Sequence, residues 1–465
     1  MYFEQFYLGC LAHASYMLAS EGETVVVDPQ RDVDLYIKAA EEHGVKIAHI
    51  FETHLHADFV SGHRELAART GAKIYMGARA GAAFPHVDVS DGFELRVGTI
   101  RLKALETPGH TEESICLVVT DEGQDAAKSP WAALTGDTLF IGDVGRPDLS
   151  KKHTAAELAG MLYDSLHNKL LQLPDHVLVY PAHGAGSLCG RNMRAERSST
   201  IGTERLTNYA LQIKSREEFV RQLTTNLPAR PEYFLQDAEI NRTGATTLSE
   251  LPDLPAITPE ELKSLLEDGV IALDVRSDDE FAAGHVPGSI NIALSGQFAS
   301  WAGVILGLSA GPVLIAASPE QSSEARLRLA RVGIENVRGQ LHGGVSAWQQ
   351  AGFALAVLPQ ITVKTLDARL QHQTSQVLDV RREPEWHAGH IEGAIWWPLD
   401  NFKIAPPEID HDAPIAVHCK GGYRSMIACS LLQRAGFRNV SNVSGGFDAW
   451  QMAQLPTEKE TPVGT

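Results

Sequence analysis

The sequence predicts an α/β protein built from three domains, and three observations support this fold class. The chain has 465 residues, which is too long for a single hydrophobic core. Short β-branched runs alternate with helical stretches, which is typical of sheets covered by helices. The C-terminal part of the chain contains one set of motifs twice, which indicates a duplicated domain.

Composition and charge narrow the functional classes. Hydrophobic residues make up 44% and charged residues 21%, as in ordinary globular proteins, and the net charge is −18. An acidic surface repels phosphate backbones and anionic lipid, so nucleic-acid and membrane binding are disfavoured. We expect no secretory signal, since Glu4 stands where a basic segment would be, and no apolar stretch is long enough to span a bilayer.

The cysteines favour a reducing compartment. They are five in number, widely scattered, and without disulfide-type or zinc-type spacing. We therefore expect a cytoplasmic protein. Separately, we expect the chain to form a homo-oligomer. The five positions are Cys10, Cys116, Cys189, Cys419 and Cys429.

The first domain is expected to span residues 1–245. Residues 25–28 form a strand that ends at a carboxylate, and residues 34–43 form an amphipathic helix. Residues 48–53 form another strand, whose end leads directly into a histidine cluster. A helical stretch over 206–223 closes the domain, and the proline-rich segments after it mark a boundary.

The duplicated part predicts two small domains, at 256–356 and 359–460. Each copy alternates strand and helix, which predicts a mainly parallel sheet with helices on both faces. Three motifs recur in order: Leu273–Arg276 as Leu378–Arg381, Ala283–Ile290 as Ala388–Ile395, and Gly343–Trp348 as Gly445–Trp450.

The first domain carries four clusters of potential metal ligands. Each follows an apolar run and lies beside a Gly or Pro turn or at a strand exit, so the clusters can converge on one point. A single histidine of this kind would be interpreted as a surface or core residue, but an ordered set of four predicts a metal site. The ligand candidates are His54, His56, Asp58, His110, Asp137 and His183.

This set resembles the metallo-β-lactamase superfamily, which implies an αββα sandwich for the first domain. The superfamily pattern is His-x-His-x-Asp-His, followed by His, Asp and His. The sixth position here is Phe59, where dinuclear zinc hydrolases such as glyoxalase II have a histidine. Phenylalanine offers no lone pair and adds an apolar wall, so a mononuclear site is favoured.

Within that superfamily, the site resembles that of persulfide dioxygenases. It implies one Fe(II) per chain held by His54, His110 and Asp137, an arrangement that leaves positions for O₂ and substrate. It also implies that three neighbouring residues orient ligands or water: His56, Asp58 and His183. The alternative for His56 is direct ligation of the metal.

Two further residues of the first domain have competing interpretations. Arg146 resembles an arginine that holds the carboxylate of a glutathione-type substrate, and the alternative is a structural Arg–Asp pair. Cys189 follows His183 closely, so it is a candidate catalytic residue that receives sulfur or contacts substrate. The alternative for Cys189 is a small buried hydrophobic residue.

The last domain places Cys419 after an apolar strand, in a glycine-bearing loop that precedes a helix over 426–433. Backbone N–H groups, the helix N-terminus, Lys420 and Arg424 favour the thiolate. The loop resembles that of rhodaneses, which implies that Cys419 and Arg424 are catalytic. The same resemblance implies that the remaining loop residues bind substrate: Lys420, Gly421, Gly422, Tyr423 and Ser425. Cys429 on the following helix is expected in the core.

The middle domain resembles a rhodanese without its nucleophile. Its loop contains Ala316 and Ala317, and either alignment puts alanine at the cysteine position. Asp274, Arg276 and His285 remain, and we expect them to support the fold. A domain without a thiol cannot carry persulfide, so we expect a scaffold or docking module.

The order of domains resembles bacterial persulfide dioxygenase–rhodanese fusions. The resemblance implies oxidation of a small thiol persulfide by O₂ to thiol and sulfite, and sulfur transfer from Cys419 to sulfite, which gives thiosulfate. Fusion raises the local concentration of the shared intermediate. Two alternatives are a glyoxalase II-type zinc thioester hydrolase, which Phe59 disfavours, and a non-catalytic sulfur carrier, which the intact ligand trio disfavours.

Overall fold

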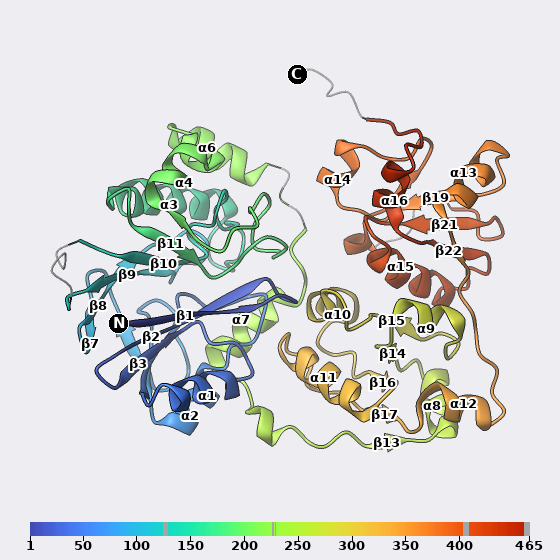
Figure 1. The fold of residues 1–465 in the computed structure, drawn as a ribbon, viewed down its shortest axis with the longest axis horizontal. Coiled ribbons are helices and arrows are strands. Elements are labelled where there is room, and N and C mark those ends of the chain that lie inside the picture. Colours follow the sequence, from blue (N-terminus) through green and yellow to red (C-terminus); the bar gives the residue numbers. More distant parts are fainter. Residues whose placement is uncertain (124–128, 226, 228, 403–408, 460–465) are drawn as a thin grey trace. The chain divides into compact units, whose positions relative to one another are not determined.

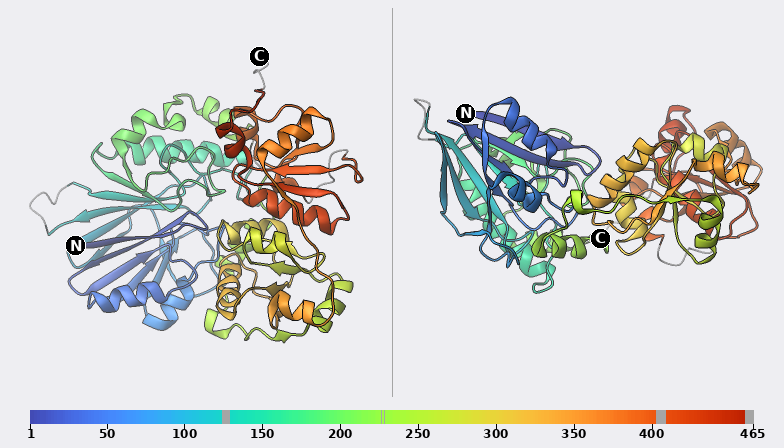
Figure 2. Two further views of the ribbon diagram at one scale, coloured as in Figure 1. Left: turned by 45° about the vertical axis from the view of Figure 1, so that its right-hand side comes forward. Right: turned by 90° about the horizontal axis from the view of Figure 1, so that it is seen from below.

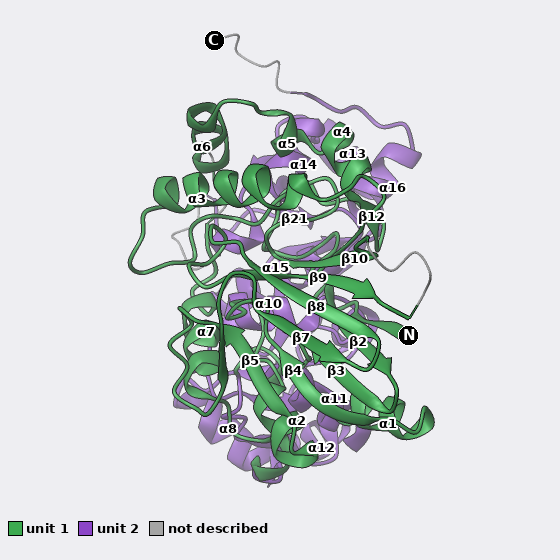
Figure 3. Cartoon of the chain, turned by 90° about the vertical axis from the view of Figure 1, so that its left-hand side faces the viewer, with its two compact units in different colours: residues 1–251, 330–333 green, residues 252–329, 334–465 purple. Residues whose placement is uncertain are grey.

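A computed structural model of the chain describes residues 1–123, 129–225, 227, 229–402 and 409–459. The chain forms two compact units (Figure 3). Unit 1 comprises residues 1–251 together with 330–333, and unit 2 comprises residues 252–329 and 334–465.

Unit 1 contains two six-stranded sheets, ordered β1-β2-β3-β4-β5-β6 and β12-β11-β10-β9-β8-β7. The first consists of β1 (Tyr2–Leu8), β2 (His13–Ser20), β3 (Glu23–Val27), β4 (Lys46–Phe51), β5 (Lys73–Gly77) and β6 (Val87–Val89). The second consists of β7 (Glu94–Val97), β8 (Ile100–Glu106), β9 (Ile115–Asp121), β10 (Ala132–Gly136), β11 (Leu178–Pro181) and β12 (Ser199–Thr200).

Helices cover the outer face of each sheet (Figure 1). One apolar cluster lies between each sheet and its helices, and a third lies between the two sheets. Val27, Phe51 and Leu117 belong to the layer between the sheets. The predicted αββα sandwich is therefore confirmed. The helices are α1 (Asp34–Glu42), α2 (His63–Thr70), α3 (Ala155–Asn168), η1 (Leu170–Gln172), α4 (Ile201–Thr207), α5 (Tyr209–Gln212), α6 (Arg216–Thr224), α7 (Phe234–Thr243) and η2 (Leu248–Glu250).

The helical stretch predicted over 206–223 is divided into pieces, α4, α5 and α6. The breaks have a local cause. The side chain of Asn208 accepts a hydrogen bond from the backbone N–H of Ala210, and that of Ser215 accepts one from Glu218. Both residues adopt extended backbone and begin a new helix, because Asn and Ser side chains satisfy the free N–H groups of a first turn.

Strand ends bring the candidate ligands together. β3 and β4 are parallel neighbours, and so are β10 and β11, so each pair ends at a common edge. Asp28 follows β3, His54 follows β4, Asp137 follows β10 and His183 follows β11. Buried strands thus deliver polar side chains to one place.

Unit 2 contains two five-stranded sheets, ordered β13-β17-β16-β14-β15 and β18-β22-β21-β19-β20. Every pairing described in them is parallel, which confirms the predicted sheet type. The strands follow the same order in both sheets, and Figure 2 shows the two repeats from two further sides.

The first repeat consists of β13 (Ala256–Ile257), α8 (Pro259–Glu267), β14 (Ala272–Asp274), α9 (Asp278–Ala283), β15 (Ile290–Asn291), α10 (Phe298–Leu306), β16 (Val313–Ile315), α11 (Pro319–Ala330), β17 (Gly339–Leu341) and α12 (Gly344–Gln350). The second consists of β18 (Gln360–Ile361), α13 (Val363–Gln371), β19 (Gln376–Asp379), α14 (Glu383–Ala388), β20 (Ile395–Trp396), η3 (Leu399–Asn401), β21 (Ile415–His418), α15 (Tyr423–Arg434), β22 (Val440–Val443) and α16 (Gly446–Met452). Among the described residues, no helix has the length and apolar character needed to cross a bilayer.

Candidate active sites

Three predicted metal ligands converge in unit 1. Asp137 Oδ2 lies 3.3 Å from His110 Nε2 and 3.8 Å from His54 Nε2. All three side chains are buried, and neither Nε2 atom has a hydrogen-bond partner among the described residues. Burying a polar atom without a partner is costly, so two such nitrogens facing a carboxylate fit a divalent metal ion.

The opposite nitrogens of both rings are held by hydrogen bonds. His110 Nδ1 lies 2.9 Å from the carbonyl oxygen of Arg146, which can only accept, so this nitrogen carries the proton. Thr53 Oγ1 donates to Asp28 and lies 3.0 Å from His54 Nδ1, so it accepts from that nitrogen. Both rings therefore present the Nε2 lone pair toward Asp137.

Charge and burial together explain the protonation states of the metal trio, by which we mean His54, His110 and Asp137. Burial would raise the pKa of Asp137, but His183, His54 and His110 outweigh burial and lower that pKa well below its usual range. Burial is also the main reason why the pKa values of His54 and His110 are lowered. An ionised carboxylate and two neutral imidazoles are the forms that bind a metal.

His56 points elsewhere. Its Nε2 lies 3.1 Å from Asp28 Oδ1 and 3.4 Å from Glu52 Oε2. Burial and the charge of Asp28 raise the pKa of Glu52 well above its usual value. The ring of His56 also lies against His54, with 4.1 Å between centroids. This placement favours the orienting role of His56 over direct ligation.

His183 lies between two carboxylates. Its Nδ1 is 2.8 Å from Asp137 Oδ1, and its Nε2 is 3.0 Å from Asp58 Oδ2. Burial would lower the pKa of His183, but Asp137 and Asp58 outweigh burial and raise it well above the usual value. The imidazolium form therefore connects Asp58 to Asp137.

Cys189 lies beside this group. Its Sγ, a ring nitrogen of His183 and an oxygen of Asp58 lie within 4.8 Å of one another. Burial, then Asp58 and Asp137, raise the pKa of Cys189 well above the usual value. Cys189 is therefore a protonated thiol next to the metal trio.

Phe59 forms the apolar wall that the sequence predicts. The side chain is fully buried, with ring centroids 4.4 Å from His56 and 4.1 Å from His13. His13, at the start of β2, is a residue that sequence reasoning missed. Neither of its ring nitrogens has a hydrogen-bond partner among the described residues.

Arg146 is engaged with its own neighbours. Its Nε and Nη2 donate to the two oxygens of Asp148 at 2.6 and 2.8 Å, and its Nη1 donates to the carbonyl oxygen of Leu188. Its own carbonyl oxygen accepts from His110. These contacts favour the structural alternative, in which the side chain of Arg146 pairs with Asp148 and its carbonyl oxygen orients the ring of His110.

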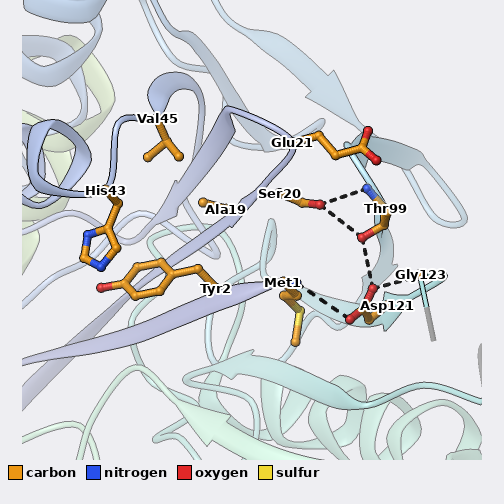
Figure 4. Close-up of a pocket in the computed structure, with 10 residues that line it drawn as sticks. All are labelled: Met1, Tyr2, Ala19, Ser20, Glu21, His43, Val45, Thr99, Asp121 and Gly123. Carbon is orange, nitrogen blue, oxygen red and sulfur yellow. Dashed lines mark hydrogen bonds and ion pairs between the residues drawn. The ribbon is translucent and has the colours of Figure 1, made fainter.

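Two hollows differ in their relation to this centre. One of about 520 Å³ lies at the N-terminal strand edge, between Tyr2, His43 and Asp121, and contains none of the predicted site residues (Figure 4). A smaller hollow of about 210 Å³ is lined by Leu55 and Thr111, the residues that follow His54 and His110. The smaller one therefore lies beside the residues that follow two of the ligand candidates.

The Cys419 loop has the geometry of an anion-binding cradle. The backbone N–H of Gly422 donates to Cys419 Sγ at 3.1 Å, and the Ser425 hydroxyl lies 3.5 Å from the same sulfur. Gly422 has a φ of +115°, which favours glycine, and α15 begins directly after it. Cys419 is buried, whereas Lys420 and Gly421 are exposed.

Arg424 and Ser425 are held by residues that the sequence did not indicate. Both terminal nitrogens of Arg424 donate to Glu385, each at 2.7 Å. The Ser425 hydroxyl lies 2.6 Å from Asn442 Oδ1. These partners come from α14 and β22, so only the folded domain brings them to the loop.

The sheet register shows which alanine replaces the cysteine in the first repeat. Asp274 pairs with Ile315, and the corresponding Asp379 pairs with His418. The next residues, Ala316 and Cys419, are therefore equivalent. In the first repeat, the Gln321 side chain accepts from the N–H of Ala317 at 2.9 Å.

Comparisons with known proteins agree with this arrangement. The metallo-beta-lactamase superfamily model matches residues 8–183, and the rhodanese-like domain model matches residues 258–351 and 362–453. Mouse (Mus musculus) mitochondrial persulfide dioxygenase ETHE1 is 31% identical over 212 residues, which cover 44% of this chain and 73% of that protein. This chain belongs to the ETHE1 family.

Two other similarities complete the comparison for this ETHE1 family member. A hydroxyacylglutathione hydrolase of Polaromonas sp. is 34% identical over 174 residues, which cover 36% of this chain and 61% of that protein. A crystal structure of a metallo-beta-lactamase from Staphylococcus aureus has 33% identity and a TM-score of 0.65, and the match covers 73% of this chain and 98% of that one.

Proposed function

We propose that this ETHE1 family member is a non-haem Fe(II) persulfide dioxygenase coupled to rhodanese sulfur transfer. The metal trio is the observation that carries the proposal: two buried Nε2 atoms without other partners face an ionised carboxylate. A donor set of two imidazoles and one carboxylate is suited to Fe(II) with open positions. We propose one ion per chain, held by His54, His110 and Asp137.

Bound Fe(II) would supply the redox change that O₂ chemistry requires and that Zn²⁺ lacks. The chain's residues prepare this site. Thr53 and the Arg146 carbonyl hold the two imidazoles, and Phe59 places an apolar ring beside His56. We propose that a low-molecular-weight thiol persulfide approaches through the small hollow lined by Leu55 and Thr111, which follow His54 and His110 in the sequence.

The overall oxidation converts R–S–SH, O₂ and water into R–SH and sulfite. The second site then uses Cys419. Its thiolate attacks the outer sulfur of a persulfide, a new S–S bond forms at Cys419, and the thiol R–SH leaves. Sulfite attacks the outer sulfur of Cys419-persulfide, so thiosulfate leaves and the thiolate returns. Gly422 N–H and Ser425 lie where they can stabilise the anionic sulfur.

Two residues keep secondary roles in this proposal. Cys189 lies beside His183 and Asp58, where it can contact substrate or receive sulfur. Its raised pKa means that such chemistry needs a base to take the thiol proton. Lys420 is exposed at the loop, where it can attract sulfite.

The similarity to a hydroxyacylglutathione hydrolase makes zinc-dependent thioester hydrolysis the second candidate function. A dinuclear hydrolase needs a second-site histidine, which Phe59 replaces here. That candidate predicts two zinc ions per chain and no uptake of O₂.

The decisive experiment is anaerobic purification with metal analysis, followed by O₂ uptake after addition of a thiol persulfide. We expect about one iron per chain and rapid uptake. His110→Ala should abolish uptake while leaving sulfur transfer intact. Cys419→Ser should abolish sulfur transfer while leaving O₂ uptake intact. Two zinc ions with thioester hydrolysis and no O₂ uptake would refute the proposal.

A further inference from the structure

The cysteine-free repeat contacts the loop that carries Cys419, within unit 2. The Tyr423 hydroxyl donates to the carbonyl oxygen of Ala293 at 2.9 Å. A Cβ added to Gly296 would lie 2.5 Å from the Tyr423 ring, so a larger residue could not occupy that position without displacing the ring. Ala293 and Gly296 lie between β15 and α10 of the cysteine-free repeat.

The contact continues along α15, the helix that begins at Tyr423. The backbone N–H of Asn291, in β15, donates to the Ser430 hydroxyl at 3.1 Å. Arg434, the last residue of α15, donates to the carbonyl oxygen of Gly288 at 2.7 Å. The cysteine-free repeat therefore supports this helix from its first residue to its last.

The first residue of α15 is adjacent to a donor for the reactive sulfur. Gly422 donates its backbone N–H to Cys419 Sγ, and Gly422 and Tyr423 share a peptide bond. Since the orientation of this N–H follows the backbone, displacement of Tyr423 shifts the donor relative to Cys419. Donors aimed at a thiolate determine how easily it forms.

A second connection leads to Arg424. The guanidinium of Arg382 lies 5.5 Å from the Trp301 ring centroid, and Trp301 is in α10 of the cysteine-free repeat. The backbone N–H of Arg382 donates to Glu385, which holds Arg424 by two hydrogen bonds. Two independent contacts therefore connect this repeat to the loop.

We propose that the cysteine-free repeat positions the Cys419 loop, with Tyr423 as the positioning residue and Gly296 as the residue that admits its ring. The inference rests on the proposed sulfur transfer at Cys419 and gives the silent repeat a role in it. The cysteine-free repeat restrains the Cys419 loop through its contact with Tyr423.

The test measures the alkylation of Cys419 by iodoacetamide in the full-length chain as a function of pH, with mass spectrometry of the Cys419 peptide. Tyr423→Phe removes only the hydroxyl, and Gly296→Val displaces the ring. Each variant should slow alkylation at neutral pH by about 2- to 10-fold, the effect of one hydrogen bond, and move the profile to higher pH. The double variant should be slower by less than the product of the two effects.

Arg434→Gln is the matched control, because it weakens the same helix contact at the end remote from the loop. It should leave the alkylation profile unchanged. Wild-type profiles in both Tyr423→Phe and Gly296→Val would overturn the proposal. An equal shift in Arg434→Gln would overturn it too, since loosening of the repeats would then explain the effect. If Gly296→Val does not fold, Tyr423→Phe decides alone.

This readout needs no sulfur substrate, so it is separable from the proposed function. A wild-type chain that transfers no sulfur would refute the sulfurtransferase proposal, whatever the alkylation profiles. Alkylation profiles that respond to neither Tyr423→Phe nor Gly296→Val would refute the positioning role, even in a chain that makes thiosulfate.

Discussion

At the residue scale, the orientation of two histidine rings decides what the metal trio can hold. Each ring uses Nδ1 for a hydrogen bond within the protein and leaves Nε2 for the proposed metal ion. For His54 this depends on Thr53, whose hydroxyl donates to Asp28 and is therefore free to accept from the ring. Thr53 thus determines the tautomer of His54, a proposed metal ligand.

We therefore expect Thr53→Val to weaken metal binding about 10- to 100-fold, since it removes the acceptor that holds His54 Nδ1–H. The measurement is the metal retained during dialysis against increasing chelator. Thr53→Ser keeps the hydroxyl and should behave as wild type. Equal metal retention in the valine and serine variants would contradict this role.

The sequence indicated the residues that carry chemistry better than it indicated their partners. His54, His110 and Cys419 lie in short motifs after apolar runs, and such motifs are readable in one dimension. Glu385 and Asn442 contact the Cys419 loop from other elements. Contacts of this kind arise only from tertiary packing, so spacing along the chain carried no signal for them.

At the element scale, close packing of a loop determines the geometry of the trio. A Cβ built on Gly145 would lie 2.0 Å from the carbonyl oxygen of Asp137 and 2.8 Å from His110 Nδ1. The loop after β10 can therefore approach the two ligands only because residue 145 has no side chain.

Gly145→Ala should consequently destabilise unit 1 by at least about 1–3 kcal/mol and lower its metal content. Thermal unfolding and metal analysis of the purified variant provide the two measurements. Gly9→Ala is a suitable control, because a Cβ there meets no atom within 4 Å. A Gly145→Ala protein with normal stability and metal content would show that the loop can shift at no cost.

Element boundaries were less predictable than element types. The stretch over 206–223 is helical, as expected, but it is divided at Asn208 and Ser215. Hydrophobic periodicity reports the buried face of a helix and continues across a break of one or two residues. Capping side chains provide the missing signal, since Asn and Ser favour helix starts.

At the scale of the whole molecule, a buried histidine whose pKa is lowered should make unit 1 sensitive to acid. Burial, His56, Arg64 and Arg31 lower the pKa of His63 to about 3. The unfolded chain has a histidine pKa near 6.5, so below that pH the unfolded state binds more protons than the folded state. The free energy of unfolding should therefore fall as the pH drops from about 6.5 toward 3.

His63→Gln should make this dependence shallower, because glutamine does not titrate. Urea unfolding of the metal-free protein at about pH 7 and about pH 5, followed by hydrogen exchange of peptides from residues 1–251, measures the slope. The same slope in wild type and variant would show that His63 contributes nothing to the acid sensitivity.

The order of the repeats could be predicted because each copy retains its framing motifs, Asp-Val-Arg and Gly-Gly-x-x-Ala-Trp. Contacts between the copies could not be predicted from the sequence, since Tyr423 and Gly296 belong to no repeated motif. The motifs that both copies share predict their common fold. The different roles of the two copies depend on positions at which their sequences differ.

The Gln321 side chain has a consequence for any attempt to reactivate the silent repeat. It already occupies the N–H of Ala317, and α11 begins at Pro319, which has no N–H to offer. A cysteine introduced at position 316 would enter a loop in which the N–H of Ala317 is already paired and Pro319 offers none. We therefore expect Ala316→Cys alone not to give this repeat sulfurtransferase activity, because the turn around the new thiol would also have to change.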